Sequence, residues 1–262
     1  MNELQRRRLL VAGVAAWAVL LLVLGFFGTD ATVREHRDVA AARTAVDKAT
    51  VDVVRAAGRD AVVRVSRYQR VGECKVSVIR SGAEYRRRIE LHVTPGGERD
   101  LLARIADRLP DDYRAYHNAG RLFADAPEFI TVRGGTREGL LWVDLLTECR
   151  PFDEPVTTWR TAPTKAERDH IETVRELFGV TDRSARWHSE TVVCGDQAIR
   201  EVSLTVADVP DRPLEDSARL MAPDARVLVS TERLLAFREG GVSVVVEVRD
   251  GMLRITRTAV TC

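Results

Sequence analysis

The sequence predicts an α+β protein: an N-terminal transmembrane helix followed by two tandem, duplicated units, each with helices packed on a mainly antiparallel sheet. Three observations lead to this fold class. They are an uncharged apolar run near the N-terminus, landmarks that recur at a nearly constant spacing, and stretches in which apolar and polar residues alternate. The chain has 262 residues, more than the usual size of one domain.

The apolar run spans Leu9–Gly28 and contains no charged residue. Because a helix rises about 1.5 Å per residue, the run is long enough to cross the ~30 Å hydrocarbon layer of a membrane. The basic residues at positions 6–8 precede it, which predicts a cytoplasmic tail at 1–8 and an extracytoplasmic location for the rest. We therefore expect a single-pass protein of the cell membrane, held by an uncleaved signal anchor at 9–28.

A cleaved signal peptide is the alternative interpretation of the same run. The apolar stretch of a signal peptide is typically about 7–15 residues long and ends in small residues at the cleavage site. This run is longer, and the segment 26–30, FFGTD, is a poor cleavage site. The signal anchor is therefore the favoured interpretation.

Charge limits the classes of partner. The whole chain has a net charge of +1, and the residues beyond the apolar run have a net charge of −1. The chain as a whole therefore lacks the excess of positive charge typical of nucleic-acid-binding proteins, and we expect no nucleic-acid partner. Nearly all basic residues are Arg, a bias typical of a GC-rich bacterial genome.

A long juxtamembrane helix is predicted at 30–58, where neither proline nor glycine occurs before Gly58. Small apolar residues form one seam at heptad spacing within 39–56. Two interpretations follow: a homodimer through a short coiled coil at 39–56, or a seam that packs on the protein's own sheet. We favour the second, because the repeat is short and alanine buries little area. The seam consists of Val39, Ala42, Val46, Ala49, Val53 and Ala56.

The duplication is predicted from spacing. Early landmarks recur about 120 residues apart and later ones about 113 apart, so one deletion of about seven residues in the second copy reconciles them. We expect a first unit at 29–150, a proline-containing linker at 151–163 and a second unit at 164–262. The landmark pairs are Gly58 with Gly179, Cys74 with Cys194, Pro110 with Pro223, and Cys149 with Cys262.

Alternation and turn residues predict the elements of the first unit. A half-buried strand is expected at 84–93, with an apolar face that Arg87 interrupts. A helix is expected at 98–109, stopped by Pro110. Strands at 128–133 and 140–148 are expected to be joined through the glycine-containing segment 134–139.

The second unit carries two clear local signals. Thr164 and Glu167 form a capping-box pattern that begins a helix reaching Phe178. Strands at 242–249 and 252–258 flank Asp250 and Gly251, a pair that favours a type I′ hairpin turn.

Four cysteines, an even number outside the cytoplasm, predict disulfides rather than a metal site. The duplication favours Cys74 with Cys149 and Cys194 with Cys262. A pairing of Cys149 with Cys194 and of Cys74 with Cys262 also respects the duplication and stays open.

The sequence contains no common catalytic, nucleotide-binding or metal-binding motif, so we predict no catalytic, cofactor or metal residues. The segment 188–190, HSE, resembles triad members, but neighbours on a strand point to opposite faces. Between Arg55 and Arg104, twelve basic residues stand against six acidic ones. This excess indicates either a solvated polar face or a surface that binds anionic lipid or polymer. The candidates for anionic-surface binding are Arg64, Arg67, Arg86 and Arg88.

The expected function is a binding or scaffolding module for a cell-envelope or membrane-protein partner. The alternative is an envelope hydrolase that acts on cell-wall polymer through an active site without a recognised motif.

Overall fold

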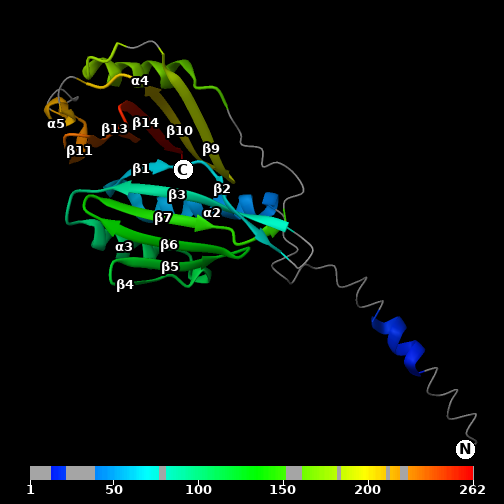
Figure 1. Ribbon diagram of the computed structural model, residues 1–262. Coiled ribbons are helices and arrows are strands. Elements are labelled where there is room, and N and C mark those ends of the chain that lie inside the picture. Colours follow the sequence, from blue (N-terminus) through cyan, green and yellow to red (C-terminus); the bar gives the residue numbers. More distant parts are fainter. Residues whose placement is uncertain are drawn as a thin grey trace, which may run out of the picture.

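The fold is α+β, with two antiparallel sheets and a few helices, in a computed structural model of the chain (Figure 1). The structure describes residues 13–21, 39–76, 81–151, 161–181, 184–210, 213–218 and 224–261.

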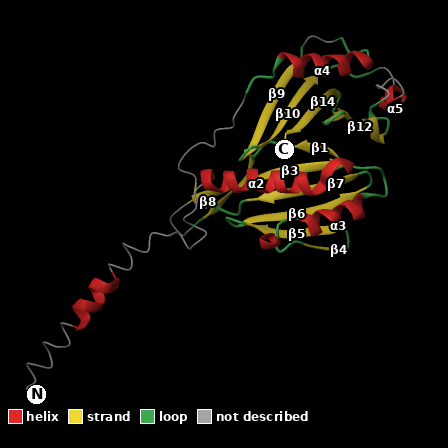
Figure 2. Cartoon of the chain, turned by 180° about the vertical axis from the view of Figure 1, so that it is seen from behind, coloured by secondary structure: helices red, strands yellow, loops and turns green. Residues whose placement is uncertain are grey.

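The first sheet is 8-stranded, in the order β1-β3-β7-β6-β5-β4, with β2 and β8 also paired to β3. Helices α2 and α3 pack on one of its faces, and Figure 2 shows both helices in front of the strands. The bounds are α2 Val39–Ala57, β1 Val62–Val65, β2 Gln69–Lys75, β3 Ser81–His92, α3 Glu98–Arg108, β4 Tyr116–Asn118, β5 Arg121–Ala126, β6 Ile130–Arg137, β7 Leu140–Leu146 and β8 Arg150–Pro151. Short 3-10 helices lie at Gly58–Asp60 and Asp111–Tyr113.

The second sheet is 6-stranded, in the order β11-β12-β13-β14-β10-β9. One of its faces packs against α4 through a separate apolar core, which contains Ile171, Val174 and Phe178 of the helical segment. The bounds are α4 Lys165–Leu177, β9 Arg186–Cys194, β10 Gln197–Val206, α5 Leu214–Ser217, β11 Arg226–Ser230, β12 Leu234–Glu239, β13 Val242–Arg249 and β14 Met252–Thr261.

The two sheets share one strand order. The path β2-β3-β7-β6-β5-β4 in the first matches β9-β10-β14-β13-β12-β11 in the second, strand for strand. In both halves, a helix (α2 or α4) precedes the first hairpin of the path (β2–β3 or β9–β10). A second helix (α3 or α5) follows that hairpin in the sequence, before the next strand.

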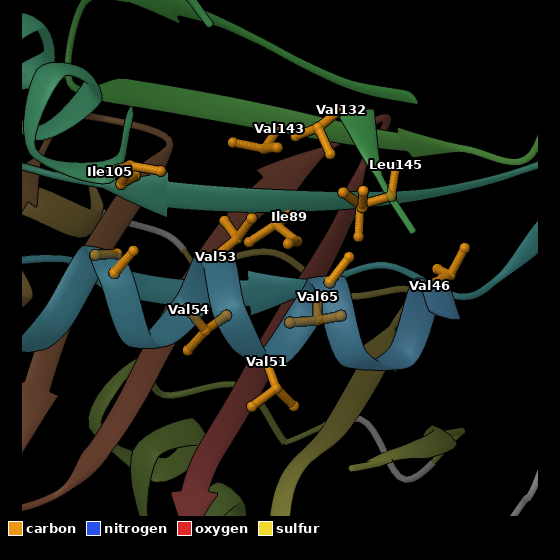
Figure 3. Packing of buried hydrophobic residues seen from close by; sticks show 14 of the residues in the cluster. Val46, Val51, Val53, Val54, Val65, Ile89, Ile105, Val132, Val143 and Leu145 are labelled. Atoms are coloured by element: carbon orange, nitrogen blue, oxygen red, sulfur yellow. The ribbon is translucent and has the colours of Figure 1, made fainter. Parts of the chain in front are cut away.

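The seam of α2 is buried in the first core. Every seam residue is 5% exposed or less, and Figure 3 shows Val46 and Val53 beside Ile89 of β3 and Leu145 of β7. The interpretation that the seam packs on the protein's own sheet is therefore confirmed, and the seam is not exposed for a coiled coil. The predicted start of this helix, at 30–38, lies outside the described residues.

Strand β6 corrects one prediction. It continues to Arg137 through Gly134 and Gly135, which were expected to lie in the connection to the next strand. A Cβ on Gly135 would lie 2.7 Å from Cζ2 of Trp142, so this glycine makes room for a neighbouring side chain within the sheet. The connection itself is limited to residues 138 and 139, and β7 ends at Leu146 rather than at 148.

Other local predictions are confirmed. Strand β3 covers most of the predicted 84–93, and α3 ends one residue before Leu109. Thr164 and Glu167 form the predicted capping box at the start of α4. Asp250 and Gly251 have φ values of 52° and 72°, as a type I′ turn requires. Strand β14 extends three residues beyond its predicted end.

Two predicted segments fall mainly outside the described residues. Of the apolar run 9–28, residues 13–21 are described and form a helix. Within the described ranges, no helix is both long enough and apolar enough to cross a bilayer. Of the linker 151–163, residues 152–160 are not described.

The edge of the first sheet meets a face of the second. The backbone N–H of Val63 donates to Oγ of Ser243 at 3.0 Å, and that of Val65 donates to Oε2 of Glu201 at 2.7 Å. Figure 1 shows β1 between the two sheets. Side chains of one sheet thus satisfy the free backbone edge of the other, which protects that edge from other strands.

Candidate functional site

A groove of about 790 Å³ lies where the second sheet extends past β1. Its floor is the segment from β1 to β2, and its wall consists of β9, β10 and β14. Its polar lining residues include Arg64, Arg67, Arg186, His188, Glu201, Ser203, Thr205, Arg254 and Thr256.

Strand alternation places these side chains in the groove. On β10, Val202 and Leu204 point into the core below α4 and are fully buried. Glu201 and Ser203, one residue out of phase, lie on the opposite face and line the groove. The polar face of the second sheet is therefore the one that meets the first sheet.

The groove carries an excess of positive charge. Among the described residues, four arginines line it, against the lining carboxylate of Glu201. Glu247, beside the groove, pairs with Arg64 at 3.0 Å and with Arg254 at 3.4 Å. Arg186 is exposed and makes no ion pair within the described part of the chain. Glu90 also pairs with Arg64, so one positive charge remains beyond the three nearby carboxylates of the described residues.

Arg64 is held rigidly at the bottom of this corner. It contacts Glu90 of its own sheet at 3.2 Å and Glu247 of the other sheet at 3.0 Å. Burial by itself would lower the pKa of Arg64, but the charges of Glu247, Glu90 and Glu201 outweigh it and raise the pKa. The guanidinium is therefore a fixed positive charge between the sheets.

Glu201, the lining acid of the groove, has a shifted pKa. Burial raises its pKa to about 7, although the charge of Arg64 and the bond from the Val65 N–H both act to lower it. This carboxyl therefore takes up a proton at a higher pH than an ordinary glutamate does.

His92 lies buried in the same corner, on the outer side of β3. Neither of its ring nitrogens has a hydrogen-bond partner in the described structure. Burial, together with the charge of Arg64, lowers its pKa to about 4, so the ring is neutral at physiological pH.

The four arginines predicted from the sequence divide into two pairs. Arg64 and Arg67 line the groove, and Nε of Arg67 donates to Nε2 of His188 at 2.7 Å. Arg86 and Arg88 lie on β3, outside the groove lining. Arg88 makes two bonds of 2.7 Å to the carboxylate of Asp144. The structure therefore does not unite all four in one site.

Sequence reasoning missed the contribution of the second sheet. Arg186, Glu201 and Arg254 come from three of its strands and were not singled out. The alternation of β10 and β14 could have placed such residues on a polar face. Which surface that face meets depends on how the two sheets pack, and no local pattern carries that information.

Arg87, which interrupts the apolar face of β3, is fully buried in an ionic triad. It contacts Asp47 of α2 and, at 2.6 Å, Glu190 of β9. A buried charge needs such partners, because desolvation would otherwise cost several kcal/mol. This triad joins the first core to the second sheet.

The segment 188–190 does not form a catalytic triad. His188 accepts a hydrogen bond from Arg67, and Glu190 binds Arg87. Ser189 points to the opposite face, where its hydroxyl donates to the carbonyl of Thr161. The prediction that these neighbours diverge is confirmed.

The disulfide Cys74–Cys149 is formed as predicted, with a Cα–Cα distance of 5.9 Å. Cys194, by contrast, is a free thiol, and its predicted partner Cys262 lies outside the described residues. The Cys194–Cys262 pair therefore stays a prediction.

Among the described residues, no three His, Cys, Asp or Glu side chains converge as metal ligands would. Comparison with family models, with curated proteins and with solved structures found no match to this chain.

Proposed function

We propose that this chain is a membrane-anchored, extracytoplasmic binding module whose groove between the sheets takes an anionic ligand from the cell envelope. The observation that carries the proposal is the charge of the groove: four arginines line it, with Glu201 as the lining acid. Guanidinium groups are suited to carboxylate, sulfate and phosphate because they donate two parallel hydrogen bonds.

The groove is also organised before a ligand arrives. Carboxylates on two strands hold Arg64 in place, so little side-chain entropy remains to be lost there. Hydroxyl groups of Ser203, Thr205 and Thr256 lie along the wall and supply further donors. Fixed donors and charges on a rigid sheet favour specific binding over simple solvation.

A membrane anchor at 9–28 is part of the proposal. Every described residue of 13–21 is exposed, including Val14 at 69% and Trp17 at 64%. An apolar helical surface of this kind favours a lipid or protein environment over water. With the basic residues at 6–8 ahead of it, the anchor would place the two sheets outside the cytoplasm.

Duplication of one unit is the second architectural part of the proposal. The shared strand order supports it, and so does a repeated ion pair. Asp47 of α2 binds Arg87 of β3, and Glu167 of α4 binds Arg200 of β10. The acids are 120 residues apart and the arginines 113 apart, the same two spacings as the other landmarks before and after the first hairpin.

The groove is tested with the full chain in detergent micelles and with polygalacturonate as an acidic probe. Arg67→Gln with Arg186→Gln removes two exposed charges of the lining and should weaken binding about tenfold or more. Arg168→Gln is the matched control, because Arg168 lies on α4, on the other side of the second sheet. Equal binding by the groove variant, or equal binding of uncharged dextran, would contradict the proposal.

An envelope hydrolase that acts on cell-wall polymer is the second candidate, and one observation favours it. Glu201, with its pKa raised to about 7, lines a groove that also contains His188. Perturbed acids in clefts are a common feature of general acid–base catalysis. Release of soluble fragments from purified cell wall by the wild type, lost in Glu201→Gln with binding retained, would identify an enzyme. No release by the wild type would leave the binding module.

A further inference from the structure

The outer face of the first sheet, turned away from α2 and α3, continues from the groove. Strand register places one residue from each of five strands in a row that begins at Arg64 in the groove and ends at Arg121. At about 4.8 Å between strands, this row is about 19 Å long. In order, it consists of Arg64, Glu90, Trp142, Gly135 and Arg121.

Trp142 forms a flat aromatic platform in this row. A Cβ on Gly135 would lie 2.7 Å from Cζ2 and 3.0 Å from Cε2 of the indole, so the ring lies against the bare backbone of β6. The guanidinium of Arg88 lies 5.2 Å from the ring centroid and is held by Asp144. The indole is therefore fixed in place, with a positive charge over its ring.

A second aromatic platform lies farther along the same face. Tyr116 of β4 stacks on Phe123 of β5 with their centroids 5.3 Å apart. Tyr116 is 58% exposed, although it is a large aromatic residue. The face thus presents two aromatic groups, one at each side of the glycine in β6.

Unpaired arginines lie between these platforms. Arg121 pairs in register with Gly135, and Arg133 pairs in register with Phe123 and with Asp144. Both side chains are exposed, and neither makes an ion pair within the part of the chain that the structure describes. Unlike Arg88, they have guanidinium groups free to bind an anion.

We infer that this row binds an extended acidic glycan, which runs from the groove across the outer face of the first sheet. The apolar C–H face of a sugar ring packs on the exposed phenol of Tyr116, and its acidic substituents meet Arg121 and Arg133. The inference rests on the proposed function, because the groove holds one end of the same chain. The ligand class is thereby an acidic polymer rather than a small anion.

The shape of the site favours a polymer over a lipid surface. The groove is lined by residues of both sheets and is a recess between them. A flexible chain can enter a recess and continue over an adjoining face, whereas a flat bilayer cannot follow that path. The net charge of −1 beyond the apolar run also disfavours a nucleic acid.

Chain length is the property that tests the inference. Binding of galacturonate monomer and of oligogalacturonates is measured by calorimetry on the full chain in detergent micelles. We expect oligomers that span the row to bind about tenfold or more tightly than the monomer. Arg121→Gln with Arg133→Gln should remove this gain and leave monomer binding unchanged, and Tyr116→Leu should reduce the gain.

The groove variant, Arg67→Gln with Arg186→Gln, distinguishes the two proposals, and Arg168→Gln is again the control. The groove variant should weaken binding of the monomer and of the oligomers alike. If oligomers bind the Arg121 and Arg133 variant as tightly as the wild type, the glycan row is wrong while the groove stands. If neither probe binds, the proposed function fails as well. Tighter binding of polyuridylate than of the oligogalacturonates would overturn the glycan class.

Discussion

The two sheets have the same strand order, yet each uses its central arginine differently. Arg200 of the second sheet binds one carboxylate, Glu167, at 2.6 Å, and its side chain is 20% exposed. Arg87 of the first sheet is fully buried and binds two carboxylates, one from α2 and one from β9. In the second half this ion pair therefore joins a helix to its own sheet. In the first half the corresponding arginine also joins the two halves.

The polar faces of the sheets differ in the same way. The polar face of the second sheet receives the edge strand β1, whose N–H groups are taken by Ser243 and Glu201. The outer face of the first sheet keeps Arg121 and Arg133 exposed. The polar face of the second sheet therefore supports the edge of the first sheet, whereas the outer face of the first sheet provides an exposed surface.

The largest expected effect comes from the arginine that joins the halves. Arg87→Met leaves the carboxylates of Asp47 and Glu190 buried without their partner and should cost about 3–5 kcal/mol of unfolding free energy. Arg200→Met is the matched variant and should cost about 1–3 kcal/mol, because Arg200 is partly exposed and binds one carboxylate. Urea unfolding measures both. Equal losses would show that the bridging role of Arg87 is not realised.

The next largest loss of unfolding free energy is expected when the disulfide is removed. Cys74→Ser with Cys149→Ser opens a link across 75 residues and should cost about 2–5 kcal/mol. Cys194→Ser removes a thiol that is free in the structure and should leave both the stability and its response to reductant unchanged. A loss of stability in Cys194→Ser that reductant reproduces in the wild type would instead indicate a bond to Cys262.

The next test uses the pH dependence of the unfolding free energy, to which Glu201 contributes. Its pKa is raised from 4.5 to about 7 in the folded protein, so the native state binds more protons than the unfolded state between these values. Its contribution to stability is therefore present below about pH 4.5 and is lost as pH rises through about 7. Glu201→Gln should be more stable than the wild type above pH 7, by at most about 3 kcal/mol at 1.36 kcal/mol per pKa unit.

The measurement is the difference in unfolding free energy between this variant and the wild type at several pH values. The difference is needed because His92 acts in the opposite sense. Its pKa is lowered from 6.5 to about 4, so its stabilising contribution is lost as pH falls through that range. A difference that does not change with pH would show that Glu201 is not the titrating group.

The smallest expected effect is local to the second half. Thr164→Ala removes the side-chain acceptor of the capping box at α4 and should cost about 1 kcal/mol. Thr164→Ser keeps the hydroxyl and is the control. Thermal unfolding measures the change, and a loss as large as that of Arg87→Met would contradict the ranking.

Sequence alone determined the features that depend on near neighbours. The capping box at Thr164, the type I′ turn at Asp250 and the alternating faces of β3 were predicted, because each is specified by residues a few positions apart. The disulfide Cys74–Cys149 was predicted as well, from the repeated spacing of landmarks. The burial of the α2 seam followed from its narrow width and small side chains.

Tertiary structure alone decided the rest. Gly134 and Gly135 resemble turn residues, but close neighbours such as Trp142 make them part of a strand. The groove unites Arg64 with Arg254, and the triad unites Arg87 with Glu190, across more than a hundred residues. Such contacts arise from the packing of one sheet edge on another sheet's face. Because that packing depends on the whole shape of both surfaces, no local pattern of residues predicts it.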